Sequence, residues 1–156
     1  MRIIGIDPGT GILGFGVIDV YKGKATLVDA GVIRTPAKED DAVRLQTIFE
    51  ELTSIIAETK PQQMAVEKLF FAQNVTTAMT VSQARGVILL TGKLAGLEIF
   101  EYTPLQIKQS LTGYGRAEKQ QIQEMVKVIL HLKAIPKPDD CADALAAAIT
   151  HSMTMR

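Results

Sequence analysis

The stretch Pro138-Asp139-Asp140-Cys141-Ala142-Asp143-Ala144-Leu145-Ala146-Ala147-Ala148 decides how the chain folds. Proline is favoured near the start of a helix, so the stretch predicts a helix that begins close to Asp139 or Asp140. Asp140 and Asp143 are three residues apart and therefore share one helical face. The small residues that follow predict close backbone contact with a neighbouring element. Helix capping would explain one aspartate, but it does not explain Asp143 on the face that we expect to be docked.

The bulk composition predicts an ordinary globular protein. The chain has 156 residues, 47% of them hydrophobic and 22% charged, which suits a single domain over residues 1–156 with a sizeable core. A single cysteine excludes an internal disulfide and a cysteine-based zinc site. The first residues become polar too soon for a signal peptide, and no apolar run has the length of a membrane span. We therefore expect a cytoplasmic protein with no membrane partner.

Charge is unevenly distributed along the chain, although the formal net charge is zero. Between Glu39 and Glu58 there are six acidic side chains and one basic side chain, whereas between Thr103 and Lys133 there are five basic and two acidic side chains. A polyanion would meet the second region and avoid the first. Chance patterning on solvated faces is the alternative explanation.

The first half of the chain predicts a sheet with two acidic strand ends. β-Branched and apolar runs at residues 2–6, 13–20 and 25–33 are joined by short turns, so they predict an antiparallel meander. Helical spacing over residues 40–59 precedes a short strand at residues 64–67, and such a crossover makes that strand parallel to the first. Asp7 and Glu67 then lie at neighbouring carboxyl ends, where ligands bind in such sheets. A turn-forming Asp7 and a plain surface Glu67 are the alternatives.

The second half of the chain predicts one more strand and several helices. Residues 74–97 form a long helix, with Asn74 as its cap, that is apolar on two sides. One side should meet the sheet and the other a second copy of the chain, or both should be buried within one domain. Residues 98–102 predict a fifth strand, and residues 104–111 and 117–132 predict two helices. The fold class is therefore α/β, with a five-stranded mixed sheet flanked by helices.

Four carboxylates can converge in this arrangement, from Asp7, Glu67, Asp140 and Asp143. Clustered carboxylates do not all stay ionised without a cation. Oxygen ligands select hard divalent ions such as Mg²⁺ or Mn²⁺, and two such ions about 4 Å apart suit phosphodiester hydrolysis. The expected function is a metal-dependent nuclease with a basic flank of Lys108 and Lys119. Phe70 and Phe71 would place an aromatic stacking platform beside it, or would pack as a loop lid.

Five fragments resemble, in order and spacing, the RuvC family of Holliday junction resolvases. They are Ile4-Gly5-Ile6-Asp7-Pro8-Gly9, Glu67-Lys68-Leu69-Phe70, Gln83-Ala84-Arg85-Gly86, Tyr114-Gly115-Arg116-Ala117-Glu118-Lys119 and Asp140-Cys141-Ala142-Asp143-Ala144-Leu145-Ala146. The resemblance runs nearly end to end. It implies a ribonuclease H-like fold and a homodimer that nicks two opposed strands of a four-way DNA junction, with the RuvA–RuvB branch-migration complex as partner.

The resemblance also implies residue roles. It gives Asp7, Glu67, Asp140 and Asp143 catalytic, metal-binding roles with two Mg²⁺ ions, for which Mn²⁺ can substitute. It implies DNA contacts by Phe70, Phe71, Lys108, Arg116 and Lys119. Family members often carry basic residues where this chain has Gln73, Thr77 and Thr80, so some phosphate contacts should be missing and the salt dependence of binding should be flatter. Asp139 could compete with Asp140 as a ligand.

Three other functions remain possible from the sequence. The fragment Asp7-Pro8-Gly9-Thr10-Gly11 resembles the phosphate loop of actin-like ATPases and sugar kinases, but that class needs two such domains. RuvC-like ribosomal RNA-processing nucleases share a related fold and an acidic site. A non-catalytic junction-binding module would not need Asp7. Cys141 and His151 have no partners at metal-ligand spacing, so we expect them to be structural or surface residues.

Overall fold

A computed structural model describes residues 1–68 and 75–155 of the chain. Within these residues five strands and five helices follow one another in the expected order. The strands are β1 (Arg2–Asp7), β2 (Ile12–Tyr21), β3 (Lys24–Arg34), β4 (Gln63–Glu67) and β5 (Glu98–Tyr102), and the helices are α1 (Asp41–Thr59), α2 (Val75–Leu94), α3 (Pro104–Thr112), α4 (Lys119–Ile129) and α5 (Asp139–Thr154).

The strands form one mixed sheet in the order β3-β2-β1-β4-β5. β1 pairs with β2, and β2 with β3, in antiparallel fashion, which confirms the predicted meander. β4 lies parallel to β1, and β5 lies parallel to β4. The expected α/β class with a five-stranded mixed sheet is therefore confirmed.

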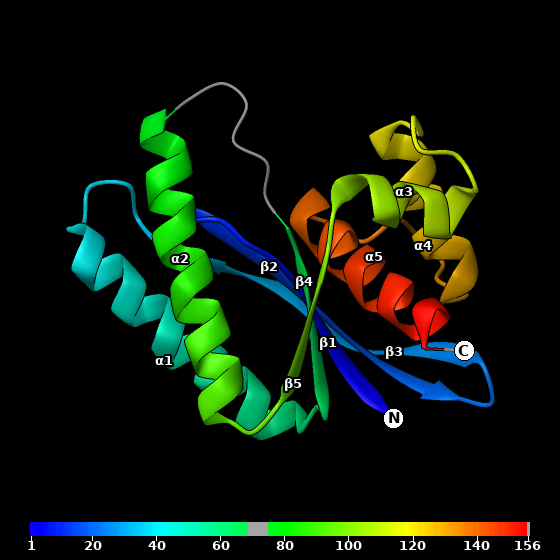
Figure 1. Cartoon of the computed structure of the whole chain (residues 1–156), viewed down its shortest axis with the longest axis horizontal. Coiled ribbons are helices and arrows are strands. Elements are labelled where there is room, and N and C mark those ends of the chain that lie inside the picture. The colour runs from blue at the N-terminus through cyan, green and yellow to red at the C-terminus, as the bar shows by residue number, and fades with distance from the viewer. Residues whose placement is uncertain (69–74, 156) are drawn as a thin grey trace.

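Helices cover both faces of the sheet (Figure 1). Alternate side chains of a strand point to opposite faces, so Ile3 packs with α3, α4 and α5, while Ile4 packs with α1 and α2. Residues 3–6 of β1 carry no polar side chain and are buried, because both faces of the strand are covered. α5 and the carboxyl end of β4 meet at the upper edge of the sheet in Figure 1.

Two helices, α2 and α4, differ from the prediction by more than one residue at an end. α2 ends at Leu94 rather than at residue 97, because Gly96 adopts a left-handed backbone (φ +80°) that helices use to stop. α4 spans Lys119–Ile129 rather than residues 117–132, and its start is set by a capping box between the N-cap Glu118 and Gln121 in the first turn. The expected Asn74 cap lies outside the described residues. No helix in the described ranges has the length and apolar content needed to cross a membrane.

α5 lies directly on glycines of β1 and β2. A methyl group on Gly5 would overlap the carbonyl oxygen of Ala144, and one on Gly14 would overlap the carbonyl oxygen of Asp140. A methyl group on Gly16 would come within 2.5 Å of the Leu145 side chain. We call Gly5, Gly14 and Gly16 the glycine seam. It confirms the expected close docking of the alanine-rich helix, and it fixes the height of the helix above the sheet.

His151 is a buried structural residue, 1% exposed, which anchors the last turns of α5. Its Nδ1 lies 2.6 Å from the Tyr102 hydroxyl, and its Nε2 lies 2.7 Å from Gln63 Oε1. Because an amide oxygen only accepts, Nε2–H donates to Gln63 and the Tyr102 hydroxyl donates to Nδ1. Phe100 stacks on the ring at 4.2 Å. Burial lowers the pKa of His151, which keeps this hydrogen-bonding arrangement neutral.

We expect His151→Leu to lower the free energy of unfolding by about 2–4 kcal/mol, because it leaves the Tyr102 hydroxyl and the Gln63 amide buried without their partner. Urea unfolding followed by circular dichroism measures this change. Tyr21→Phe is the control, because Tyr21 is 73% exposed and should lose little. Equal stability of the two variants would contradict a structural role for His151.

Candidate active site

Asp7 and Glu67 end two adjacent parallel strands. Ile6 lies opposite Val66 in the β1–β4 ladder, so the next residue of each strand projects from the same edge of the sheet. The two carboxyl groups share a side-chain hydrogen bond. The sequence-based prediction that these two strand ends are neighbours is therefore confirmed.

α5 brings two further carboxylates to this edge. The helix begins at Asp139 after Pro138, and no described side chain makes a capping hydrogen bond, although Asp139 and Asp140 both lie in the first turn. Asp140 and Asp143 both act electrostatically on Asp7. Asp139 instead lies 3.4 Å from Lys137 Nζ and 3.7 Å from Lys119 Nζ. The geometry favours Asp140 over Asp139 as a member of the carboxylate cluster, which we define as Asp7, Glu67, Asp140 and Asp143.

The carboxylate cluster is electrostatically strained at neutral pH. Burial, followed by repulsion from Glu67 and Asp143, raises the pKa of Asp7 to about 9. Burial also raises the pKa of Glu67, although the hydrogen bond from Asp7 opposes this effect. Burial likewise raises the pKa of Asp143 against the opposing charge of Lys119. A shared proton or a cation relieves such a cluster.

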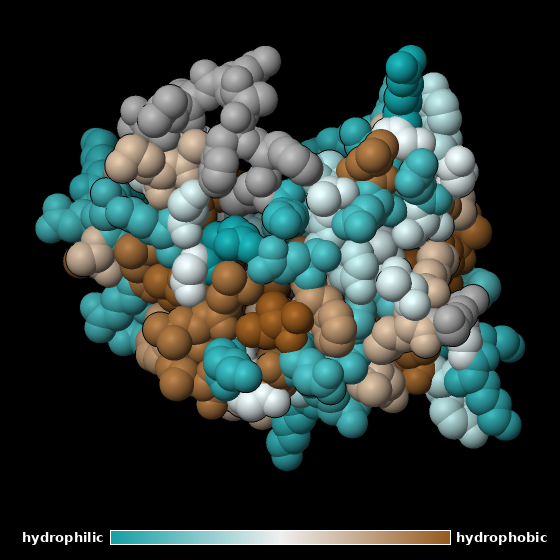
Figure 2. Space-filling view, in the orientation of Figure 1, coloured by the Kyte–Doolittle hydropathy of each residue, from teal (hydrophilic) through white to brown (hydrophobic). Residues whose placement is uncertain are grey.

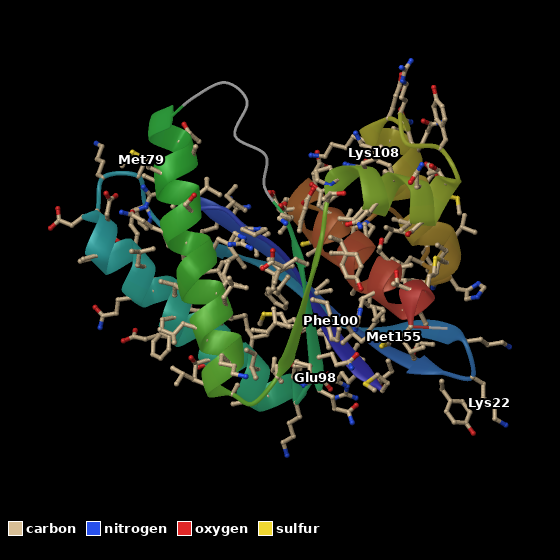
Figure 3. All side chains as sticks on the ribbon, viewed as in Figure 1. Lys22, Met79, Glu98, Phe100, Lys108 and Met155 are labelled. Carbon is tan, nitrogen blue, oxygen red and sulfur yellow. The ribbon has the colours of Figure 1, made fainter. Side chains whose placement is uncertain are left out.

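A cleft of about 250 Å³ opens beside the cluster. Glu67 and Asp143 line it together with Lys108 and Lys119, which confirms that the two predicted basic residues flank the carboxylates. Figure 3 shows Lys108 on α3, at the same end of the sheet as the start of α5. Partial burial opposes the charge of Lys119, but Asp143 outweighs that effect, so the pKa of Lys119 is raised. The other lining residues are Pro104, Ile107, Ile122 and Ala146.

The donor chemistry of the cluster suits a hard divalent cation. All four side chains offer carboxylate oxygens, which Mg²⁺ and Mn²⁺ prefer, and neither His151 nor Cys141 belongs to the cluster. Among residues 1–68 and 75–155, no three acidic, histidine or cysteine side chains are already closed around a common point. The site therefore consists of converging carboxylates that would still have to draw together around an ion.

A family model described as "Crossover junction endodeoxyribonuclease RuvC" matches residues 3–151. The chain belongs to the RuvC family. It is 58% identical over 156 residues to the RuvC of Heliobacterium modesticaldum, covering 99% of this chain and 96% of the relative. It is 57% identical to the RuvC of Brevibacillus brevis, covering 97% of this chain and 92% of the relative.

Solved RuvC structures share the whole fold. Thermus thermophilus RuvC superimposes with a TM-score of 0.93 at 38% identity, covering 100% of this chain and 96% of that one. The same protein in complex with a Holliday junction substrate superimposes with a TM-score of 0.95 at 38% identity, covering 100% and 95%. The yeast mitochondrial resolvase Ydc2, 12% identical with a TM-score of 0.71, shares the fold alone. The ribonuclease H-like fold implied by the resemblance is confirmed.

The remaining predicted contacts of this RuvC family member lie apart from the cleft or outside the described residues. Arg116 is exposed and does not line the cleft. Phe70, Phe71 and Gln73 lie outside the described residues, so their predicted roles stay predictions. The Thr80 hydroxyl donates to the carbonyl oxygen of Thr77 within α2.

Sequence reasoning missed two contacts near the site. Arg85 of α2 forms an ion pair with Glu101 of β5, one residue before the position that pairs with Glu67. Lys119 pairs with Asp143, and the only signal for this contact was a lysine placed against the helix dipole. No spacing rule for a single helix or strand could have predicted either pair, because each pair joins two different elements.

Proposed function

We propose that this RuvC family member is a structure-selective endodeoxyribonuclease that resolves four-way, or Holliday, DNA junctions. The observation that carries the proposal is the carboxylate cluster from β1, β4 and α5 beside a cleft with two lysines. The proposal is supported by the 38% identical Thermus thermophilus protein, whose solved complex contains a Holliday junction substrate. Its expected role is in DNA recombination and repair.

Asp7, Glu67, Asp140 and Asp143 would hold two Mg²⁺ ions, with Mn²⁺ as a substitute. When bound, such ions supply an activated water and neutralise charge on the scissile phosphodiester. The chain's own residues position these carboxylates: two lie at strand ends, and two lie at the start of a helix that rests directly on the glycine seam. Lys108 and Lys119 would contact the DNA phosphates that enter the cleft.

A homodimer would match the symmetry of the substrate, since paired nicks in two opposed strands need two sites related by a two-fold axis. α2 supports this proposal. It buries Ala84 and Ile88 against the sheet but exposes Met79, Leu90 and Leu94 by 55–68%, and an apolar area lies over α2 and β5 in Figure 2. We further propose that residues 1–156 act as one domain in the cytoplasm, together with the RuvA–RuvB complex.

Cleavage of a synthetic four-way DNA junction tests the proposed function. With Mg²⁺, purified protein should introduce paired, symmetric nicks and should leave a linear duplex of the same sequence uncut. An RNA junction and ATP are offered in parallel. Preference for the RNA substrate would favour an RNA-processing nuclease, and ATP hydrolysis would favour an actin-like ATPase. If the protein binds the junction but does not nick it with any divalent cation tested, it is a non-catalytic junction-binding module.

A further inference from the structure

Lys119 reaches from the start of α4 to the carboxylate cluster. Its Nζ lies 3.4 Å from Asp143 Oδ2 and 3.7 Å from Asp139 Oδ2. A positive charge in the first turn of a helix opposes the partial positive charge of that helix end. The position of Lys119 therefore does not stabilise α4, and the acidic start of α5 is what holds its side chain.

The two partners of the main contact differ in their freedom to move. The Asp143 side chain is 24% exposed and belongs to α5, which the glycine seam holds against the sheet. The Lys119 side chain is 57% exposed and sits on a long, flexible stem. If the ion pair breaks, it is therefore the lysine that leaves. Both residues line the cleft, so a phosphate entering there meets the ammonium group beside Asp143.

We propose that Lys119 is an internal counter-ion of the DNA-free protein, which holds Asp143 and so competes with a divalent cation until a DNA phosphate takes the lysine over. This inference deepens the proposed function and rests on it, because it concerns the same cation and the same phosphates. The oxygen-only donor set fits the cation, as described above. One positive charge on Lys119 thus serves two anions in turn, first a carboxylate and then a phosphate.

Transfer of Lys119 from Asp143 to a DNA phosphate couples DNA binding to cation binding. A phosphate that draws Lys119 away frees Asp143 for the cation, so each ligand should raise the affinity for the other by the same factor. The chain would then complete its cation site only when DNA lies in the cleft.

The first test measures Mn²⁺ binding by calorimetry without DNA. Lys119→Gln should bind Mn²⁺ about fivefold more tightly than the wild type, because Asp143 loses its competing partner. Lys137→Gln is the matched control, since Lys137 pairs with Asp139 at 3.4 Å but with no member of the cluster, and it should stay within about twofold. Lys108→Gln removes a cleft charge that is not paired with the cluster's Asp143, and it should have a smaller effect than Lys119→Gln. Equal affinities for Lys119→Gln and wild type, or equal gains for Lys119→Gln and Lys108→Gln, would overturn the inference.

The second test repeats the titration on a four-way junction with non-hydrolysable linkages at the cut sites. The junction should raise the Mn²⁺ affinity of the wild type by a larger factor than that of Lys119→Gln. An equal rise in both proteins would overturn the transfer of the lysine to phosphate. Failure of the wild type to bind the junction would instead overturn the proposed function, and the DNA-free titration would still decide whether Lys119 competes with the cation.

Discussion

Asp7→Asn should abolish junction cleavage while leaving junction binding in place. The substitution removes one carboxyl group from the centre of the cluster, where Glu67, Asp140 and Asp143 all act on Asp7. Residues that act as a unit lose most of the rate when one is removed, so we expect a fall of about a thousandfold or more in the single-turnover rate. Gel-based cleavage and gel-shift assays on the same labelled junction measure the two properties separately.

The same substitution should stabilise the metal-free protein at neutral pH. The pKa of Asp7 rises from 3.8 to about 9 on folding, so between these values the folded chain holds a proton that the unfolded chain lacks. Stability therefore falls as pH rises through this window. The asparagine side chain stays neutral and can still donate to Glu67, so the variant should gain about 1–4 kcal/mol at pH 7 and lose the part of the pH dependence that comes from Asp7. Thermal unfolding in EDTA between pH 5 and 9 measures this.

Asp29→Asn provides the control for both effects. Asp29 is exposed on β3, and its Oδ1 accepts from the Ala30 N–H, as an asparagine oxygen also can. This variant should cleave and unfold like the wild type, and we expect Mg²⁺ to raise the melting temperatures of both proteins by the same amount. Normal cleavage by Asp7→Asn would remove Asp7 from the active site, and a lower stability in EDTA would contradict the strained carboxylate cluster.

Gly14→Ala should damage both stability and activity. A methyl group on Gly14 would meet the carbonyl oxygen of Asp140, and its carbon atom at 2.5 Å, so the start of α5 would have to lift from β2. The atoms in the way are backbone, which cannot rotate aside. We expect a loss of about 2–4 kcal/mol in the free energy of unfolding and a fall of about a hundredfold in cleavage, because Asp140 moves with the helix.

Gly86→Ala is the matched control for this prediction. Gly86 lies in the interior of α2, and a methyl group added there would have nothing within 4 Å, so the same chemical change meets no obstacle. Alanine favours a helix by about 0.5–1 kcal/mol over glycine, and the variant should therefore be slightly more stable. Urea unfolding, cation titration and junction cleavage of Gly14→Ala and Gly86→Ala test whether contact between α5 and the glycine seam is needed for stability and activity. Wild-type cleavage by Gly14→Ala would show that the glycine seam does not set the position of Asp140.

Local sequence patterns predicted much of the fold. The strand ends at Asp7 and Glu67 could be predicted because a short apolar run and a helical crossover fix the direction of each strand. The docking of α5 could be predicted from its small residues, although which glycines receive it could not. The spacing of apolar residues predicts one helix or strand at a time, and it does not show which other element that helix or strand packs against.

Side-chain contacts between different elements could not be predicted for the same physical reason. His151 has no ligand-like spacing, and its partners Tyr102 and Gln63 lie 49 and 88 residues away. In the sequence, Lys119 stood out only because its charge opposes the dipole of its own helix. Its pairing with Asp143 depends on how α4 packs on α5. Such pairs depend on how the elements pack against one another. No local pattern in the sequence determines that packing.

The glycine seam also bears on when the protein becomes able to cut DNA. A growing ribosome-bound chain presents Asp7 and Glu67 early, but the helix that brings Asp140 and Asp143 follows only after roughly ten seconds of further synthesis. Until that helix settles on Gly5 and Gly14, half of the carboxylates are missing. Nuclease activity would thus appear only after the last helix has docked, and a partly made chain would lack the complete set of carboxylates.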